Sequence, residues 1–240
     1  MKNIFRVLYF SSMIYLAGCA QSEDSMLLED VDLISTYDFV GGYQDWQAGI
    51  SDFPTSTLDS TSFSFYNSRT PSNLPWQGYG LSVTADNPHG DLFYFFKKHI
   101  TGLKANKAYN LKLEFMVYSQ LDSGELVKTG ENIYLKVGAV NFEPKLERIK
   151  NENFKDYKVL NVDKGAANHD SGEDLVNLGS IVKFTKSQPD AFSGNNLKNP
   201  IRVTSDANGG SWIVIGADSG IRNRLTFGLI AITIYYSEIN

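Results

Sequence analysis

The sequence predicts an all-β protein, and three observations lead to that class. Apolar and polar residues alternate with a period of two in many segments after residue 34. Clusters of Asp, Asn, Gly and Pro separate these segments, as turns do. No long stretch holds a period of 3.6 residues. With 240 residues, 42% of them hydrophobic, the chain can bury a large core without disulfides.

The alternating segments are expected to be half-buried strands. In chain order they are residues 61–66, 81–84, 108–118, 133–137, 211–216 and 225–236. Residues 92–96 are apolar throughout, which suits a strand covered on both faces. The apolar segment 225–236 is expected to lie inside its sheet and not at an edge. Residues 144–157 are the best helical candidate, expected to form a short helix or a loop.

These seven segments are the clearest of about ten strands expected in the chain, and that number favours a two-sheet antiparallel β-sandwich of jelly-roll type. A closed barrel is the alternative. No repeat of 20–50 residues is visible, so a single domain is expected from residue 34 to residue 240.

The N-terminus has the features of an export signal. Lys2 and Arg6 precede a mostly apolar run over residues 7–18, which is shorter than the roughly 20 residues that cross a bilayer. The run ends in Leu16-Ala17-Gly18-Cys19. The alternative is an N-terminal helix with a buried cysteine.

Leu16-Ala17-Gly18-Cys19 resembles the lipobox of bacterial lipoproteins. The resemblance implies a signal peptide at residues 1–18, cleavage before Cys19 and a diacylglyceryl group on Cys19. Ala20 in the next position implies sorting to the outer membrane, with the periplasmic or surface face left open. Two acyl chains would hold the protein firmly on the membrane.

The acidic residues are concentrated near the N-terminus. Residues 19–68 contain no Lys or Arg, and residues 19–33 are expected to form an acidic flexible tether. The whole chain has 22 basic and 27 acidic residues, which argues against a nucleic-acid partner. The single Cys excludes an internal disulfide and a multi-cysteine zinc site.

Most of the remaining chain resembles a set of uncharacterised secreted or lipid-anchored bacterial proteins. The segments that resemble it are residues 46–54 (WQAGISDFP), 91–103 (DLFYFFKKHITGL) and 216–220 (GADSG). The resemblance implies a jelly-roll-like sandwich and no particular chemistry.

Motifs for catalysis are missing from the sequence. It contains no Gly-x-Ser-x-Gly, no His-Glu-x-x-His, no phosphate-binding loop and no dinucleotide fingerprint. Residues 218–220 match part of a trypsin-like nucleophile loop, but Asp-Ser-Gly also forms a good turn. A catalytic role is therefore the less expected one.

A calcium ion is a possible cofactor. Ca²⁺ prefers six to eight oxygen ligands, and a loop rich in Asp and Asn could supply them from Asp163, Asp170 and Asp174. The spacing matches no ordered calcium-loop motif, so ordinary turn chemistry is the alternative.

Loop aromatics are the remaining signal for a ligand. An aromatic ring can stack on a sugar while neighbouring amides bind its hydroxyl groups. The candidate ligand-binding residues are Tyr43, Trp46, Gln47, Trp76, Gln77 and Tyr79. The alternative is that these rings close the open end of the sandwich.

Together these features predict a lipid-anchored cell-envelope protein that binds glycan or another surface polymer without catalysis. The alternatives are a structural or protein-interaction envelope lipoprotein without a small ligand, and a polysaccharide hydrolase. The positions of the three tryptophans would distinguish glycan binding from protein interaction. If Trp46, Trp76 and Trp212 line one open cleft, glycan binding is favoured; if their rings are buried, the protein-interaction role is favoured.

Overall fold

A computed structural model describes residues 31–55, 63–121, 132–150, 156–181 and 189–239. Within these residues the fold is all-β and contains no α-helix, which confirms the predicted fold class. Neither do they include a helical stretch that could span a membrane. The expected signal peptide, Cys19 and most of the expected tether lie outside the described residues.

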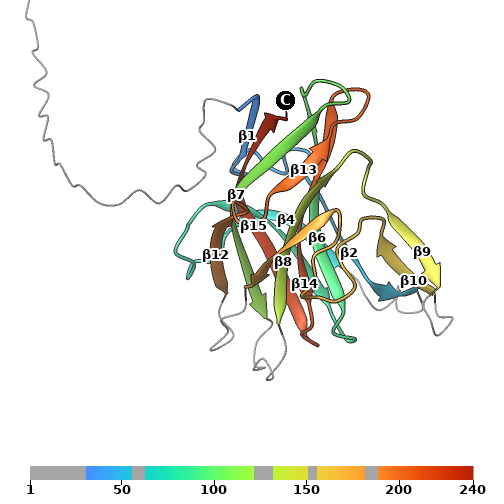
Figure 1. Ribbon diagram of the computed structural model, residues 1–240. Coiled ribbons are helices and arrows are strands. Elements are labelled where there is room, and N and C mark those ends of the chain that lie inside the picture. Colours follow the sequence, from blue (N-terminus) through green and yellow to red (C-terminus); the bar gives the residue numbers. More distant parts are fainter. Residues whose placement is uncertain (1–30, 56–62, 122–131, 151–155, 182–188, 240) are drawn as a thin grey trace, which may run out of the picture.

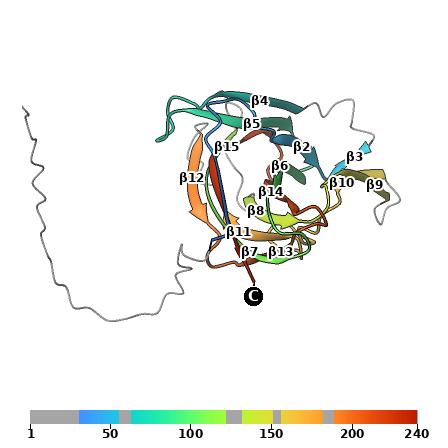
Figure 2. The same ribbon diagram turned by 90° about the horizontal axis from the view of Figure 1, so that it is seen from above.

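Two antiparallel sheets lie face to face (Figures 1 and 2). Sheet A has the strand order β12-β7-β15-β5-β4, with β1 also paired to β15 and β13 to β7. Its strands are β1 (Leu33–Tyr37), β4 (Phe63–Arg69), β5 (Tyr79–Asp86), β7 (Ala108–Leu121), β12 (Asp190–Asn195), β13 (Ile201–Thr204) and β15 (Arg224–Glu238).

Sheet B has the order β11-β8-β14-β6-β2. Its strands are β2 (Gln47–Ser51), β6 (Leu92–Thr101), β8 (Ile133–Val140), β11 (Leu175–Ser180) and β14 (Gly210–Ser219). From β5 to β8 and again from β13 to β15, the chain passes from one sheet to the other at each connection, as in a jelly roll. The long apolar strand β15 lies between β7 on one side and β5 and β1 on the other, as predicted.

The helical expectation for residues 144–157 is wrong. The described part of this segment forms β9 (Leu146–Lys150), which pairs with β10 (Asp156–Leu160). With β3 (Phe53–Pro54) these strands make a small third sheet beside sheet B (Figure 2). Every residue of β9 is exposed. Because neither face of the strand is buried, its sequence lacks the alternation of apolar and polar residues that indicates a strand.

The main core fills the space between sheets A and B. On β7 and β15 every second side chain points into it, which is the period-two pattern of the sequence. Its largest fully buried side chains include Tyr94, Phe96, Tyr109, Phe227 and Tyr236. The outward-pointing residues of sheets A and B form the two outer faces, and the candidate sites lie there.

Candidate functional site

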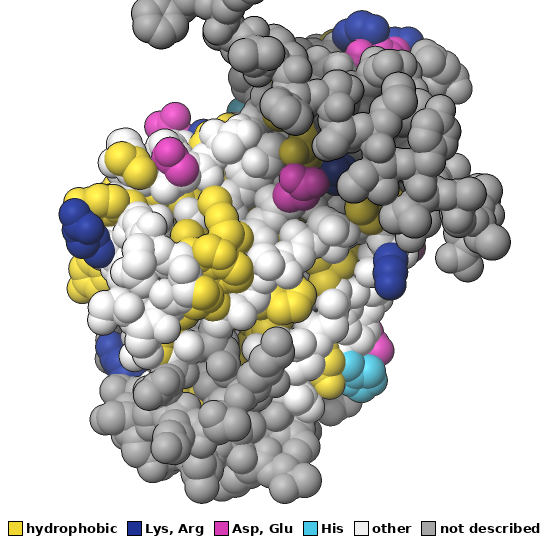
Figure 3. Space-filling model, turned by 90° about the vertical axis from the view of Figure 1, so that its left-hand side faces the viewer, with side chains coloured by type: hydrophobic (Ala, Val, Ile, Leu, Met, Phe, Trp, Pro, Cys, Tyr) yellow, Lys and Arg dark blue, Asp and Glu magenta, His cyan; other side chains and the backbone are white. Residues whose placement is uncertain are grey.

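The outer face of sheet A carries an open groove. Leu113, Phe115 and Val117 of β7 point into the core, so Glu114 and Met116 between them point outward. This face lies on the left in Figure 1 and is turned toward the viewer in Figure 3. There, hydrophobic side chains form a band across the white surface, and most of the charged side chains lie toward its edges.

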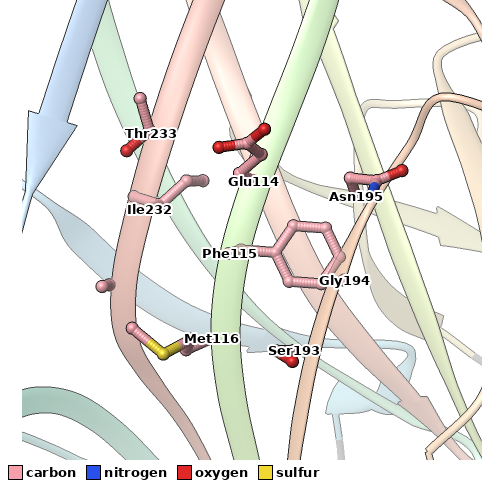
Figure 4. A pocket seen from close by; sticks show the side chains of 9 residues that line it. Glu114, Phe115, Met116, Ser193, Gly194, Asn195, Ile232 and Thr233 are labelled. Carbon is pink, nitrogen blue, oxygen red and sulfur yellow. The ribbon is translucent and has the colours of Figure 1, made fainter. Parts of the chain in front are cut away.

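The groove has a volume of about 450 Å³ and lies across three neighbouring strands (Figure 4). Its lining consists of Glu114, Phe115, Met116, Ser193, Gly194, Asn195, Ala231, Ile232 and Thr233. The register of β15 against β7 shifts between Leu229 and Ala231, so a bulge lies at one end of the groove. The small side chain of Ala231 leaves the space open.

One carboxylate in the groove is held in place by two neighbours. Glu114 accepts a hydrogen bond from the Tyr235 hydroxyl at 2.9 Å and forms an ion pair with Lys112 at 2.7 Å. The hydrogen bond from Lys112 lowers the pKa of Glu114, with Tyr235 acting in the same direction, so it remains a charged acceptor at neutral pH. The Lys112 Nζ also lies 4.8 Å from the centre of the Tyr235 ring.

The other polar groups of the groove are uncharged. Ser193 and Thr233 carry hydroxyl groups, which both donate and accept hydrogen bonds. Asn195 carries an amide, whose oxygen accepts a hydrogen bond from the Leu197 backbone at 3.0 Å. Such a set suits a neutral ligand with many hydroxyl groups.

A hydrophobic cluster lies on the same face and shares Met116 with the groove. Its members are Leu74, Trp76, Met116, Tyr118, Ala191 and Ile230. The Tyr118 ring packs against Gly228, where an added Cβ would be 1.9 Å from the nearest ring atom. Burial raises the pKa of Tyr118, although a hydrogen bond with Ser82 opposes the shift.

The loop that carries Trp76 is tied together by Gln77. The Gln77 Nε2 donates hydrogen bonds to the carbonyls of Pro71, Ser72 and Leu74, the last at 2.7 Å. Trp76 is only partly buried here, so part of its ring remains accessible beside the groove face. The predicted residues Trp76 and Gln77 therefore lie in one loop, but Gln77 holds the loop instead of facing a ligand.

The structure does not bring the three tryptophans into one cleft. Trp46 is 2% exposed and packs edge-on against Tyr37 and Phe39. It fills the core and offers no face to a sugar, so its assignment as a ligand contact is corrected here. Trp212 lies on the outer face of sheet B, with the His99 ring stacked at 5.0 Å.

The remaining predicted contacts are also dispersed. Tyr43 is 44% exposed and lies 4.9 Å from the Phe65 ring, and Gln47 is exposed at the start of β2. Tyr79 is partly buried, and the Arg69 guanidinium lies 5.4 Å from its ring centre. These side chains do not converge on the groove of sheet A.

The candidate calcium ligands are engaged in turn chemistry. Asp163 accepts hydrogen bonds from the backbone N–H groups of Gly165 and Glu173, which lower its pKa. Asp174 accepts one from the Asp163 backbone, and Asp170 one from Ala167. Within the residues that the structure describes, no three His, Cys, Asp or Glu side chains are grouped as metal ligands. These hydrogen bonds agree with the alternative to a calcium site, in which the three aspartates stabilise the turns of a loop.

A buried ionic cluster that was not predicted from the sequence lies on the outer face of sheet B. The Lys136 Nζ and the Asp218 Oδ2 are 3.1 Å apart, and both side chains are fully buried. Lys164 lies 3.0 Å from the same Asp218 oxygen and 3.1 Å from Asp52. Lys136 also donates hydrogen bonds to the carbonyls of Lys164 and Ala167, which fixes the loop above the sheet.

Burial and charge act against each other in this cluster. Burial raises the pKa of Asp52 to about 6, although Lys164 opposes the shift. Burial lowers the pKa of Lys136, opposed by Asp218. Burial also disfavours the charge of Lys164, but Asp52 and Asp218 outweigh that effect and raise its pKa.

A cavity of about 470 Å³ adjoins the cluster, with Asp52, Asp91 and Lys164 among its lining residues. These residues come from three separate turns or loops, so no spacing along the sequence connects them. The one sequence feature that could have indicated this cluster is Lys136, a single charged residue among the apolar residues of β8. The alternating pattern predicted that its side chain faces solvent.

No family model matches the chain, and no curated protein matches it in sequence. Several solved carbohydrate-binding modules have a similar overall shape. One in complex with β-1,4-galactotriose has a TM-score of 0.37 and 10% identity, over 84% of this chain and 94% of that one. The CBM22-1 xylan-binding domain of Paenibacillus barcinonensis Xyn10C has a TM-score of 0.36 and 11% identity, over 86% of this chain and 95% of that one. A mannan-recognising module has a TM-score of 0.35 and 12% identity, over 86% of this chain and 98% of that one. At TM-scores below 0.5, these likenesses carry no conclusion about ligand or site.

Proposed function

We propose that this protein is a non-catalytic glycan-binding module that uses the outer face of sheet A. The observation that carries the proposal is the groove of about 450 Å³, in which hydroxyl and amide groups lie beside one fixed carboxylate. Trp76 and Met116 add apolar surface on the same face. Sugars present both hydroxyl groups and apolar C–H faces, so this mixture of groups matches them.

A panel of soluble polysaccharides in affinity electrophoresis tests the groove. Asn195→Ala and Trp76→Ala should each weaken binding of the retained polysaccharide by about tenfold, the effect of losing one polar or stacking contact. Trp212→Ala is the matched control, because it removes a partly buried tryptophan from the opposite outer face. Equal retention of the Asn195 and Trp212 variants would show that the groove is not the site.

We further propose that a lipid on Cys19 holds the module at the cell envelope, on the outer membrane. Support comes from the sequence Leu16-Ala17-Gly18-Cys19 and from the acidic segment that follows it. The first described strand, β1, begins at Leu33, so in sequence the acidic segment separates Cys19 from the sheets. Cells fed a radiolabelled fatty acid should label the wild-type chain and not Cys19→Ser, and label on both chains would refute the lipid site.

A protein-interaction role without a small ligand is the second candidate. The observation that favours it is the dispersal of Trp46, Trp76 and Trp212 over the core and two opposite faces. Crosslinking in intact cells should then capture a stable envelope protein, while the polysaccharide panel gives no retention.

A further inference from the structure

A second pocket is lined by residues from all three sheets, whose strands β2, β3, β4, β9 and β10 gather on one side of the molecule (Figure 2). We call it the edge pocket, because β2 and β4 each end the strand order of their sheet. Its volume of about 600 Å³ is in the range of small-molecule sites. The larger apolar side chains that line it are Ile50, Phe53, Phe63, Phe95, Leu146 and Leu160.

The polar side chains of the edge pocket are two lysines. Lys97 and Lys145 line it, and none of its other described lining residues carries a hydroxyl, amide or carboxylate side chain. The groove of sheet A differs in this respect, since hydroxyl and amide side chains lie along it. The edge pocket has no such side chains to pair with a ligand that is polar along its length, so it favours a ligand with an apolar body.

The two lysines share one carboxylate. The Lys97 Nζ lies 3.1 Å from one oxygen of Glu143 and donates a hydrogen bond to the Pro144 carbonyl at 2.6 Å. The Lys145 Nζ lies 2.9 Å from the other oxygen of Glu143. These three side chains together carry one positive charge in excess, which attracts an anionic group. The Lys145 side chain is 65% exposed, so it can turn toward such a group.

Part of the apolar wall is exposed. Phe63 is 44% exposed and Leu146 is 42% exposed, although both side chains are large and hydrophobic. The Phe95 ring extends the wall from β6 onto β2, because it occupies the space that a side chain at Gly49 would need. An apolar ligand in the edge pocket would remove this surface from water, which favours binding.

We propose that the edge pocket binds a long-chain fatty acid, with its chain against Phe63 and Leu146 and its carboxylate at Lys97 and Lys145. Charge complementarity selects this occupant, because a fatty acid combines an apolar body with a single anionic group at one end. The acyl groups expected on Cys19 are esters and have no anion to place beside the lysines. The proposal does not depend on what the groove of sheet A binds.

Equilibrium dialysis of the full chain with radiolabelled palmitate tests the wall of the pocket. The chain carries Cys19→Ser, which removes the acyl groups expected there, and is freed of bound lipid beforehand. We expect saturable binding of about one palmitate per chain, and Leu146→Asp should weaken it by about tenfold or more, because a carboxylate then repels the ligand. Ile149→Asp is the matched control, since Ile149 is 43% exposed on the same strand and does not line the edge pocket.

The same assay tests the anionic end of the ligand. Lys145→Gln should weaken palmitate binding by about tenfold, the effect of losing one charged contact. Lys107→Gln is its control, because Lys107 is 54% exposed and pairs with Glu238 away from the edge pocket. Methyl palmitate has the same chain without the charge, so it should compete about tenfold less well than palmitate.

Circular dichroism checks that each variant folds. The absence of saturable palmitate binding would overturn the proposal, and so would equal affinities of the Leu146→Asp and Ile149→Asp chains. If methyl palmitate competes as well as palmitate and Lys145→Gln binds like Lys107→Gln, an uncharged acyl chain is the occupant and the fatty acid is not.

Discussion

The outer faces of the two sheets differ in what covers them. On sheet B, Leu160 and Val162 pack in one cluster with Phe93, Phe95, Val140, Leu175 and Val214, and a buried ionic cluster lies beside this second core. On sheet A the loop that carries Leu74 and Trp76 packs over part of the corresponding face, and another part carries an open groove lined mainly by small or uncharged polar residues. Both faces arise from the same alternation of side chains along strands. A pleated sheet therefore does not decide which of its faces meets solvent.

The two outer faces also differ in how far their charged side chains are removed from solvent. Glu114 on the open face pairs with Lys112 while nearly half of its side chain remains in contact with solvent. Lys136 and Asp218 on the covered face are fully buried, so each depends on the other and on Lys164. Substitutions on the two faces should therefore differ in cost, and three experiments measure that difference.

The largest effect is expected at the centre of the ionic cluster. Asp218→Asn removes the charge that pairs with both Lys136 and Lys164 and leaves two buried or nearly buried cations without it. We expect a loss of about 3–5 kcal/mol in the free energy of unfolding, measured by urea denaturation.

Asp86→Asn is the control for this substitution. Asp86 pairs with Arg224 at 3.1 Å at the surface of sheet A, with 48% of its side chain exposed. Its loss should cost less than about 1 kcal/mol. If the substitutions at positions 86 and 218 lower the free energy of unfolding by similar amounts, burial does not change how much a charged side chain contributes to stability.

A smaller effect is expected at Gly228 on the open face. Gly228→Ala places a Cβ 1.9 Å from the Tyr118 ring, which then has to move within the cluster that contains Trp76. Overpacking of this kind costs about 1–3 kcal/mol, and the tryptophan fluorescence should shift as well. Gly78→Ala is the control, since no atom lies within 4 Å of its added Cβ. An unchanged stability of Gly228→Ala would mean that Tyr118 is free to leave the sheet.

The third experiment follows Asp52 through pH. Its pKa is about 6 in the folded protein against an ordinary 3.8, because burial disfavours the charged form. The unfolded chain releases this proton at lower pH than the folded one, so ionisation of Asp52 weakens folding as pH rises from about 4 to about 6. The stability of wild type relative to Asp52→Asn should thus fall over this window and level off above it. A rise in the relative stability of wild type over the same window would show that the ion pair with Lys164 outweighs burial.

The strands could be predicted from the sequence where one face of the strand is buried. β7, β8, β14 and β15 all coincide with alternating segments, and the central place of β15 follows from its apolar run. β9 could not be predicted, since an exposed strand leaves no periodic trace of burial.

The sites were harder to predict because they depend on contacts between distant segments. The groove needs β7, β12 and β15 side by side and a bulge near Ala231, none of which a single strand pattern reveals. Trp46 was misplaced because its surroundings are rich in Gly and Gln, which are typical of loops, whereas its indole packs inward against two aromatic rings. Composition near an aromatic residue indicates the backbone conformation and not the direction of the ring.

The pairing of β1 with β15 makes the groove sensitive to mechanical load. Leu33 lies opposite Tyr236, and further along the same ladder Thr36 lies opposite Thr233, with their hydroxyl oxygens 3.2 Å apart. Thr233 also lines the groove. A force that pulls on the chain at Leu33 acts on this ladder, so tension would reach the groove wall at Thr233 together with the core residues against which Leu33 and Tyr37 pack.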